Sequence, residues 1–490
     1  MNNFYEDWIS RKKYWFNQNN DNDKYLSDNY SHLIDSYDYY RESKPILGII
    51  IYDQLTRHYY RNEYNSHILI YFNRKALEIA NKHRTSIFIN YLCYNDWMFY
   101  MLVYRHSNIR ENLLFVMNEC WKLNPLPIKF IKATYTRANF EEELDYYKYS
   151  PIDFDISILE NSPKTEISDK KLYKIGEFEN IKSDTIIISL SGGVDSIVCL
   201  FNIVKLYPNK KIIAIHINYN NRSEVEDEVK NLRCLCCFFD IELYVRKITE
   251  INRHICMCND LRDIYELYTK KIRFNCYKKF GKHPTVILGH NKDDCFENIL
   301  TNIAYNSKYE NLRGIEYSVI IDNINFIRPL INVSKNDIYK FAITHNLPYL
   351  KNSTPNWSQR GKIRMEVVPV LMKWDNRIID GLFNLSEVMK NYNEILIKSI
   401  ENFNEIEIGE IESLNTSKLY WKHGIYKIFN FYITNKSLSA LILRLELWKN
   451  KYNSIDVNKK TLIIVSNNLT IIIIKRIKNR YEIIRKYISQ

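Results

Sequence analysis

Hydrophobic residues recur every three to four positions through the first 145 residues of the chain. The runs at 45–60, 66–82 and 110–123 keep this spacing, which is typical of helices that bury one face. Alternating patterns, typical of half-buried strands, are scarce there. Residues 1–145 therefore predict an all-helical domain. Residues 146–182 break the pattern with two Ser-Pro steps and mixed charges, and we interpret them as a linker.

From residue 185 the pattern changes to short β-branched runs that alternate with helical stretches. The runs at 185–190, 211–218, 241–247 and 286–289 predict strands. Strands that alternate with helices predict a parallel sheet covered on both faces. Ligands of such sheets bind beyond the carboxyl ends of the strands. We expect an α/β domain of this kind over residues 183–372.

Residues 373–490 predict a third region, which is helical to about residue 447. The chain then has two apolar runs, 461–466 and 469–476, on either side of an Asn-Asn pair, which predict a β-hairpin. The fold class that we expect is therefore multi-domain: an all-α N-terminal domain, an α/β parallel-sheet domain, and a helical C-terminal region with a small β element.

Composition narrows the class of protein. The 490 residues are 46% hydrophobic, which excludes wholesale disorder, and only 11 Gly and 11 Pro exclude collagen-like or low-complexity architectures. No apolar stretch is long enough for a membrane helix, and no secretory leader is recognisable. Eight of the ten cysteines crowd between residues 199 and 295, unlike a disulfide framework, so we expect a reduced, cytoplasmic protein. A formal charge of +12 permits a polyanionic partner.

The most informative motif lies between the first predicted strand and its helix, and reads Ser191-Gly192-Gly193-Val194-Asp195-Ser196. Two glycines let successive backbone N–H groups point at one anion, and the helix that follows adds its positive dipole end. The hydroxyls of Ser191 and Ser196 are further donors, while Asp195 beside phosphates makes sense with Mg²⁺ between them. An ordinary Gly-containing turn is the alternative. The motif resembles the PP-loop of the N-type ATP pyrophosphatases, which cleave ATP between the α- and β-phosphates.

A second constellation follows the fourth predicted strand. His290, Asp293, Asp294 and Glu297 have the spacing of one helical face, where three carboxylates repel one another unless a cation or a reaction uses them. A solvated acidic helix face is the alternative. The pattern resembles the His-x-x-Asp-Asp-x-x-Glu-Thr motif of bacterial tRNA(Ile)-lysidine synthetases.

Further segments resemble the same family over about residues 183–371, and they are 215–222, 266–274, 327–330, 360–364 and 367–371. This chain departs from the family pattern at a few positions: Lys270 replaces an arginine, Asn298 a threonine and Gly361 an asparagine. The segment 351–355 lacks the two acids of the family's Glu-Asp-x-Ser-Asn.

The resemblance implies a reaction and roles for residues. ATP activates the C2 carbonyl oxygen of a wobble cytidine in tRNA, and the amine of L-lysine then displaces AMP. The implied phosphate cradle is Ser191, Gly192, Gly193, Val194 and Ser196, with Asp195 on Mg²⁺-pyrophosphate. Asp294, with Asp293, is implied to hold a cation or the lysine ammonium. His290 and Arg273 are implied to stabilise the transferring phosphoryl or the adenylated base, and Arg364 the tRNA or phosphates.

Basic segments independently favour a nucleic-acid partner. Residues 270–283 contain six Lys/Arg and no acid, with aromatic residues interleaved, and residues 475–486 contain six basic residues and one acid. A solvated helix or strand face is the alternative for each. We expect the C-terminal region to bind tRNA.

Two other functions stay open. Cys234-Leu235-Cys236-Cys237 contains C-x-x-C, and related PP-loop enzymes that thiolate tRNA use cysteine pairs. Core packing in an amphipathic helix is the interpretation that we favour here, because no second C-x-x-C completes a four-ligand metal site. A degenerate nucleotide- or tRNA-binding protein without turnover is the other alternative.

The N-terminal domain carries a resemblance of its own. Residues 48–61 with Phe99-Tyr100-Met101 and His106-Ser107 resemble a bacterial family of uncharacterised helical proteins of tetratricopeptide-like fold. This resemblance implies a fold and no chemistry. Asp53, Arg57, Arg61 and His106 are candidates for a site there, with buried pairs and surface charges of a helix bundle as the alternative.

Overall fold

The computed structural model describes most of the chain, and the described residues are 2–16, 19–60, 66–139, 141–147, 175–178, 181–221, 225–305, 311–350, 359–401, 403–404, 406–410, 413–429, 433–450, 461–467, 470–477 and 480–487. The chain divides into two compact units. The first comprises Met1–Gly289, Ser318–Pro329 and Ile338–Ser353, and the second comprises His290–Tyr317, Leu330–Asp337 and Thr354–Gln490.

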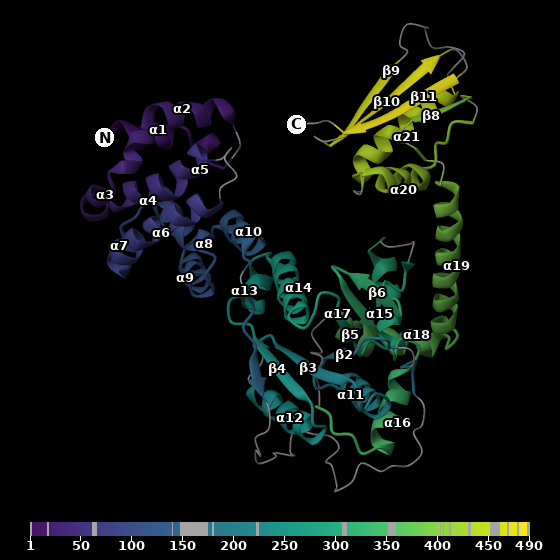
Figure 1. The fold of residues 1–490 in the computed structure, drawn as a ribbon. Helices are drawn as coiled ribbons and strands as arrows, with labels where there is room; N and C mark the ends of the chain where they lie inside the picture. The colour runs from purple at the N-terminus through teal and green to yellow at the C-terminus, as the bar shows by residue number, and fades with distance from the viewer. Residues whose placement is uncertain are drawn as a thin grey trace. The chain divides into compact units, whose positions relative to one another are not determined.

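The first unit begins with the helical domain that the hydrophobic spacing predicts (Figure 1). Its α-helices are α1 (Asn2–Ser10), α2 (Asn20–Tyr30), α3 (Tyr37–Ser43), α4 (Pro45–Ile49), α5 (Thr56–Tyr59), α6 (Ser66–Lys82), α7 (Ser86–Asn90), α8 (Tyr94–His106), α9 (Arg110–Trp121) and α10 (Ile128–Arg137). The predicted helix at 45–60 contains a π-helix, η3 (Ile50–Leu55), whose residues are all buried. Periodicity alone does not reveal this insertion, and π-turns frequently mark functional sites.

The sheet of the first unit has seven strands in the order β1-β4-β3-β2-β5-β7-β6. They are β1 (Asp145–Tyr147), β2 (Thr185–Ser189), β3 (Lys211–Asn218), β4 (Glu242–Lys247), β5 (Thr285–Ile287), β6 (Ser318–Ile321) and β7 (Ile324–Ile327). The five central strands are parallel, as expected, and the two edge strands are antiparallel. Helices α11 (Val194–Leu206) and α12 (Val225–Phe238) pack on one face and α14 (Arg262–Lys278) on the other (Figure 1).

The strand order places a topological switch point at β2. From β2 the chain adds β3 and β4 on one side, and then returns to place β5 on the other side of β2. Connections from β2 and β5 therefore leave in opposite directions, and the crevice between them is where open α/β sheets bind ligands.

The stretch 146–182, expected as a linker, belongs in part to this sheet domain. Residues 145–147 form edge strand β1, which pairs with β4. Further along, Phe178 and Ile181 are buried, and the Glu177 N–H donates to the carbonyl of Pro329 at 2.9 Å. These described parts therefore pack as elements of the domain.

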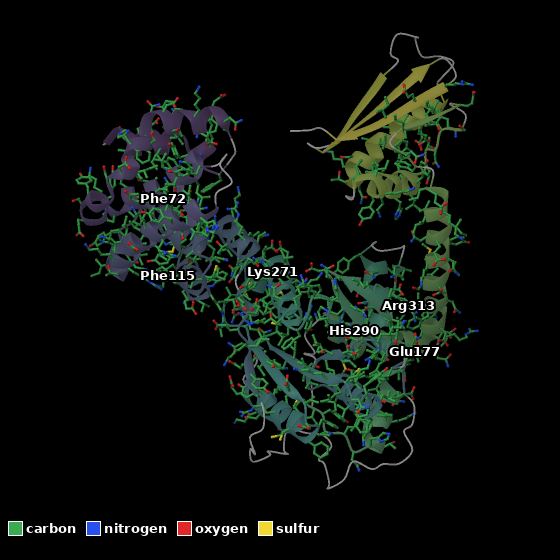
Figure 2. All side chains as sticks on the ribbon, viewed as in Figure 1. Phe72, Phe115, Glu177, Lys271, His290 and Arg313 are labelled. Atoms are coloured by element: carbon green, nitrogen blue, oxygen red, sulfur yellow. The ribbon has the colours of Figure 1, made fainter. Side chains whose placement is uncertain are left out.

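The helical bundle and the sheet share one continuous apolar core, with α10 packed against α14 (Figure 1). The Tyr135 hydroxyl on α10 donates to the carbonyl of Glu250 at 2.7 Å. Arg246 of β4, only 1% exposed, lies between two buried carboxylates: it donates to Glu142 at 2.7 Å and also to Glu250. Lys271 of α14, labelled in Figure 2, donates to the carbonyl of Ala138. Buried charges paired in this way fix two elements tightly relative to each other.

The second unit contains α15 (Lys292–Ala304), α17 (Gln359–Lys362), a π-helix η7 (Ile363–Val367), α18 (Val368–Trp374), α19 (Ile378–Ser399), α20 (Lys418–Phe429) and α21 (Asn435–Asn450). Helix α16 (Lys335–Thr344) begins in this unit and ends in the first. Among the described residues, no helix is long and apolar enough to cross a membrane.

The C-terminal region closes with an antiparallel sheet in the order β8-β11-β10-β9, formed by β8 (Ile406–Glu410), β9 (Thr461–Asn467), β10 (Thr470–Ile477) and β11 (Arg480–Tyr487). The predicted hairpin is confirmed as β9 and β10. The prediction of a helical stretch to residue 447 missed β8. It also missed β11, whose alternation is obscured by charged residues that we interpreted only as a basic patch.

Candidate functional site

The loop after β2 has the backbone that a phosphate cradle requires. Gly192 has φ +84°, and a Cβ there would lie 2.4 Å from Leu350 Cδ1. Only glycine fits both conditions. The Leu350 N–H donates to the Gly192 carbonyl at 2.9 Å, which holds the loop against the segment that follows α16.

Two hydroxyls lie inside this loop. Ser196 Oγ donates to the Gly193 carbonyl at 2.9 Å and lies 3.2 Å from Ser191 Oγ. Helix α11 begins at Val194, and its N-cap Gly193 has no side chain to satisfy the first N–H groups. Those donors and the helix dipole are therefore available to an anion at the carboxyl edge of the sheet.

The end of β5 meets the same loop. A Cβ on Gly289 would lie 3.0 Å from the carbonyl carbon of Asp195 and from the backbone nitrogen of Ser196. Glycine is therefore needed for β5 to approach the start of α11 this closely. The sequence reasoning did not single out Gly289 as functional, although a glycine directly after a buried strand was a visible signal.

Helix α14 places Arg273 at this edge of the sheet. Tyr277 Oη donates to Ser189 Oγ, at the end of β2, at 2.8 Å, and burial raises the pKa of Tyr277. One turn earlier, Arg273 Nη1 donates to Tyr219 Oη, just beyond β3, at 3.3 Å. The predicted site residues from 191 to 196 and Arg273 therefore lie at the carboxyl ends of β2 and β3.

The second unit holds the other predicted residues, and it corrects one expectation. Helix α15 begins at Lys292 with Asn291 as its N-cap, so His290 (Figure 2) precedes the helix and does not share its face with the acids. The Asn291 N–H donates to Asp294 Oδ2 at 3.0 Å, and the Asp294 N–H donates to Asn291 Oδ1 at 3.1 Å, which is a capping box. Asp293 Oδ2 accepts from the Lys335 N–H at 2.8 Å.

Arg364 joins two of these carboxylates. Its Nε and Nη2 lie 2.8 and 2.7 Å from Glu297 Oε1, and its Nη2 lies 3.7 Å from Asp294 Oδ1. Glu297 is buried, and burial raises its pKa although Arg364 opposes this. The spacing argument singled out Asp294 and Glu297, and the family resemblance implied Arg364; the structure brings these three residues together.

One departure from the family pattern has a clear structural role. Asn298 Nδ2 donates to the Arg313 carbonyl at 3.1 Å, and Asn298 Oδ1 accepts from Arg360 Nη2 at 3.1 Å. The divergent segment 351–355 lies outside the described residues. In the predicted basic stretch 475–486, Arg480 pairs with Glu410 at 3.3 Å.

The magnesium ion that the sequence predicts would need only one or two protein ligands if a substrate held it as well. In the part of the chain that the structure describes, no group of three or more His, Cys, Asp or Glu side chains gathers as a metal cage. Mg²⁺ usually binds through one or two carboxylates together with substrate phosphates. Asp195, the residue expected for that role, lies in the first turn of α11.

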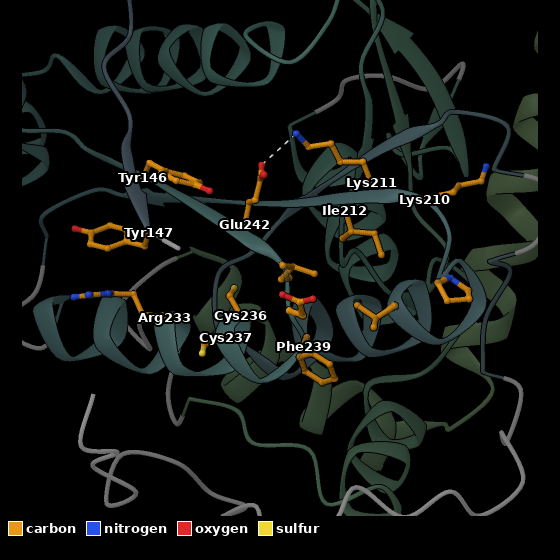
Figure 3. Close-up of a pocket in the computed structure, with 14 residues that line it drawn as sticks. Tyr146, Tyr147, Lys210, Lys211, Ile212, Arg233, Cys236, Cys237, Phe239 and Glu242 are labelled. Atoms are coloured by element: carbon orange, nitrogen blue, oxygen red, sulfur yellow. Dashed lines mark ion pairs between the residues drawn. The ribbon is translucent and has the colours of Figure 1, made fainter. Parts of the chain in front are cut away.

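The cysteines of the C-x-x-C segment lie at the opposite edge of the sheet. Cys236 and Cys237 line a cavity of about 560 Å³ together with Lys211 and Glu242, the first residues of β3 and β4 (Figure 3). Lys211 and Glu242 form an ion pair at 3.4 Å. Burial raises the pKa of the Cys236 thiol, which keeps it protonated and unreactive.

The candidates of the N-terminal bundle also come together in part. Asp53 accepts from Arg57 Nη2 at 3.2 Å and lies 2.8 Å from His106 Nδ1. Arg61 lies outside the described residues. The proposed likeness of the bundle to an uncharacterised family stays a prediction.

Comparison with known proteins agrees with the resemblance that the motifs indicate. Residues 165–371 match the family described as a PP-loop domain. The chain is 29% identical over 246 residues to the tRNA(Ile)-lysidine synthase of Clostridioides difficile, covering 48% of this chain and 52% of that protein. It is 31% identical over 215 residues to that of Clostridium tetani, covering 41% and 44%. It is 28% identical over 308 residues to a chloroplastic one of Gracilaria tenuistipitata, covering 59% and 92%.

The matched region thus spans about half of the two clostridial relatives. Among solved structures, the U34-tRNA thiolase NcsA from Methanococcus maripaludis with its [4Fe-4S] cluster matches with a TM-score of 0.33 and 20% identity, over 45% of this chain and 74% of that one. That likeness is too low to bear on function. Residues 165–371 match the PP-loop domain family, and the chain that contains them is similar to tRNA(Ile)-lysidine synthases.

Proposed function

We propose that this chain is an ATP-dependent carbon–nitrogen ligase of the tRNA(Ile)-lysidine synthetase type. ATP adenylates the C2 carbonyl oxygen of the wobble cytidine in a tRNA with a CAU anticodon, releasing pyrophosphate. The amine of L-lysine then attacks C2, and AMP leaves with the carbonyl oxygen. AMP makes this step possible because a pyrimidine oxygen is by itself a poor leaving group.

One observation carries the proposal. The loop with Gly192 and the end of β5 at Gly289 meet at the switch point of the sheet, where two glycines allow approaches that a Cβ would block. Backbone donors gathered at such a point suit a triphosphate, because they stabilise negative charge without reorganising.

The residues of the first unit would act on the nucleotide. The N–H groups at the start of α11 and the Ser191 and Ser196 hydroxyls would bind the phosphates, and Asp195 would hold Mg²⁺. When bound, that ion neutralises charge on the pyrophosphate as it departs. Arg273, donating to Tyr219 at the same edge, would stabilise charge on the transferring phosphoryl or the adenylated base.

The residues of the second unit would act on the incoming amine. Asp294 and Glu297 both lie against the guanidinium of Arg364, and the charge of Arg360 also acts on Glu297. Asp294 Oδ1 lies 3.7 Å from Arg364 Nη2, a longer contact than the 2.7 Å to Glu297, which supports the Asp294 carboxylate as the partner of the ammonium group of the lysine substrate. His290 and Asp293 lie close to Asp294 in the sequence. We propose that His290 stabilises the adenylated base.

Incubating the protein with ATP, L-lysine and a CAU-anticodon tRNA, and then measuring AMP and the modified base, tests the proposal. We expect Asp195→Ala to abolish AMP formation and Asp294→Asn to prevent lysine transfer. Asp227→Ala is the matched control, because it removes a half-exposed acid of α12 that pairs with Lys230. AMP formation retained by Asp195→Ala, or lysine transfer unchanged in Asp294→Asn, contradicts these roles.

The same experiment separates the two alternatives. Sulfur incorporation together with AMP would indicate thiolation, which the position of Cys236 and Cys237 at the amino ends of β3 and β4 disfavours, since the nucleotide loop follows the carboxyl end of β2. No AMP under any condition would indicate a binding protein without turnover.

A further inference from the structure

A buried carboxylate lies at the centre of the N-terminal bundle. Asp53, on the π-helix η3, has no exposed side-chain surface. It lies 2.8 Å from His106 Nδ1, and it accepts from Asn73 Nδ2 at 3.0 Å and from Arg57 Nη2 at 3.2 Å. Burial alone would raise the pKa of Asp53, but its contacts with His106 and Arg57 hold that pKa below its usual value. Asp53 is therefore ionised at neutral pH.

This carboxylate orients the imidazole beside it. Burial lowers the pKa of His106 despite the charge of Asp53, so the ring is neutral near pH 7. Nδ1–H then donates to Asp53, and Nε2 becomes the acceptor, 3.4 Å from Nη2 of Arg105. The ring is 16% exposed and the Arg57 side chain 30%, so solutes can reach both.

The cluster holds more positive charge than its single carboxylate balances. Arg57 and Arg105 are both cationic, and burial, followed by the charge of Arg137, lowers the pKa of Arg105 to about 10. Within the described part of the chain, Arg105 makes no ion pair, and the Nε atoms of Arg57 and Arg105 are buried without a hydrogen-bond partner. Buried donors without a partner are rare in folded proteins because each one costs desolvation energy.

We propose that Arg57 and Arg105, beside the His106 ring, form a binding site for a phosphate group on the N-terminal bundle. A guanidinium donates N–H bonds to phosphate oxygens, and a phosphate would balance the excess positive charge of the two arginines. Asp53 acts as a positioning residue, because it is fully buried and fixes the imidazole and Arg57 from behind. If the cluster only braced the bundle, Arg57 alone would neutralise Asp53. Arg105 lies over the Phe130 ring and beside His106 Nε2, and neither contact balances its charge.

The inference goes beyond the proposed ligase chemistry and is independent of the nucleotide loop. The full chain with isotope-labelled histidines gives the readout, and His106→Asn assigns the signal of His106. Inorganic phosphate is added at constant ionic strength, with chloride as the balancing salt. We expect a saturable shift of the His106 imidazole signals.

Arg105→Gln is expected to abolish this shift. Arg74→Gln, which removes an exposed arginine of α6 from the same bundle, is the matched control and should keep it. If Arg105→Gln fails to fold, Arg57→Lys keeps the charge, loses the fork, and should weaken phosphate binding at least several-fold. An unsaturable shift, or an equal response to chloride, overturns the proposal.

The source of the phosphate is a separate arm of the test. If it is an RNA backbone phosphate, Arg105→Gln lowers the slope of log affinity for tRNA against log salt by about one, while Arg74→Gln does not. If Arg105→Gln leaves that slope unchanged while inorganic phosphate still saturates the wild-type site, the ligand is a small phosphate compound. A failure of lysine transfer in the ligase assay affects neither outcome.

Discussion

Gly192→Ala adds one methyl group at the point where the loop after β2 turns toward α11. Two features of the structure determine its effect. The backbone at Gly192 has φ +84°, which side-chain-bearing residues rarely adopt, and the new Cβ would lie 2.4 Å from Leu350 Cδ1. The variant therefore tests the loop geometry on which the proposed nucleotide site depends.

The magnitude follows from these two terms. A positive φ costs an alanine about 1–2 kcal/mol. Relieving the contact requires Leu350 or the loop to move by roughly 1 Å, and such overpacking costs about 1–3 kcal/mol. If the whole cost falls on the bound conformation of the loop, ATP affinity drops by about 30-fold to several thousand-fold, at ~1.4 kcal/mol per factor of ten.

Calorimetric titration with ATP measures the affinity, and urea unfolding of the same samples measures stability. Gly281→Ala is the control, because Gly281 has φ +144° with no atom within 4 Å of its Cβ, and lies in the connection that enters β5 at the opposite edge of the sheet. We expect it to lose stability and keep ATP affinity. Leu350→Ala in the Gly192→Ala background should recover the steric part of the loss and leave the backbone part.

Two results would refute the reasoning. If Gly192→Ala binds ATP as the wild type does, the loop is not the phosphate cradle. If Gly281→Ala loses as much ATP affinity, the effect reflects a general loss of stability.

Three further predictions follow from other parts of the structure. Glu250→Gln removes one of the two buried charges that pair with Arg246, so the free energy of unfolding in urea should fall by about 3–5 kcal/mol. The exposed control Glu266→Gln should lower it by ~0–1 kcal/mol, and equal losses would contradict the pairing. The pKa of His106 is lowered in the folded state, so the unfolded chain binds the proton first as pH falls. The free energy of unfolding should therefore decrease below about pH 6.5, and less steeply in His106→Asn. Identical slopes in the two proteins would contradict a buried neutral ring. Cys237→Ser should leave AMP formation and the modified base unchanged, and loss of either would restore the thiolation alternative.

Elements with a strong local pattern could be predicted from the sequence. The strand at 211–218 and the helix at 66–82 have the predicted bounds because their apolar spacing is unbroken. Edge strand β1 has three residues, too few to show a period, and it exists only because β4 offers a partner. A sequence pattern does not contain such a pairing.

The candidate site was likewise predictable only where its residues are contiguous in the sequence. The Ser191–Ser196 loop was visible because its chemistry is contiguous, whereas the approach of Gly289 to Asp195 is a contact between segments almost a hundred positions apart. The spacing of His290 with the acids was misinterpreted because periodicity does not show where a helix begins. Asn291, three residues before Asp294, was the available capping signal for that boundary.

The strand formed by residues 145–147 and the ion network of Arg246 have a practical consequence for dissecting this protein. A fragment that starts after residue 147 would expose the open edge of β4 to other chains and would leave Arg246 without its carboxylate at Glu142. Such a fragment is expected to aggregate, since uncovered strand edges recruit further strands. The bundle and the sheet should therefore unfold in one cooperative transition. If a fragment without the bundle were inactive, disruption of the sheet domain would explain the result, and it would not show a role of the bundle in the reaction.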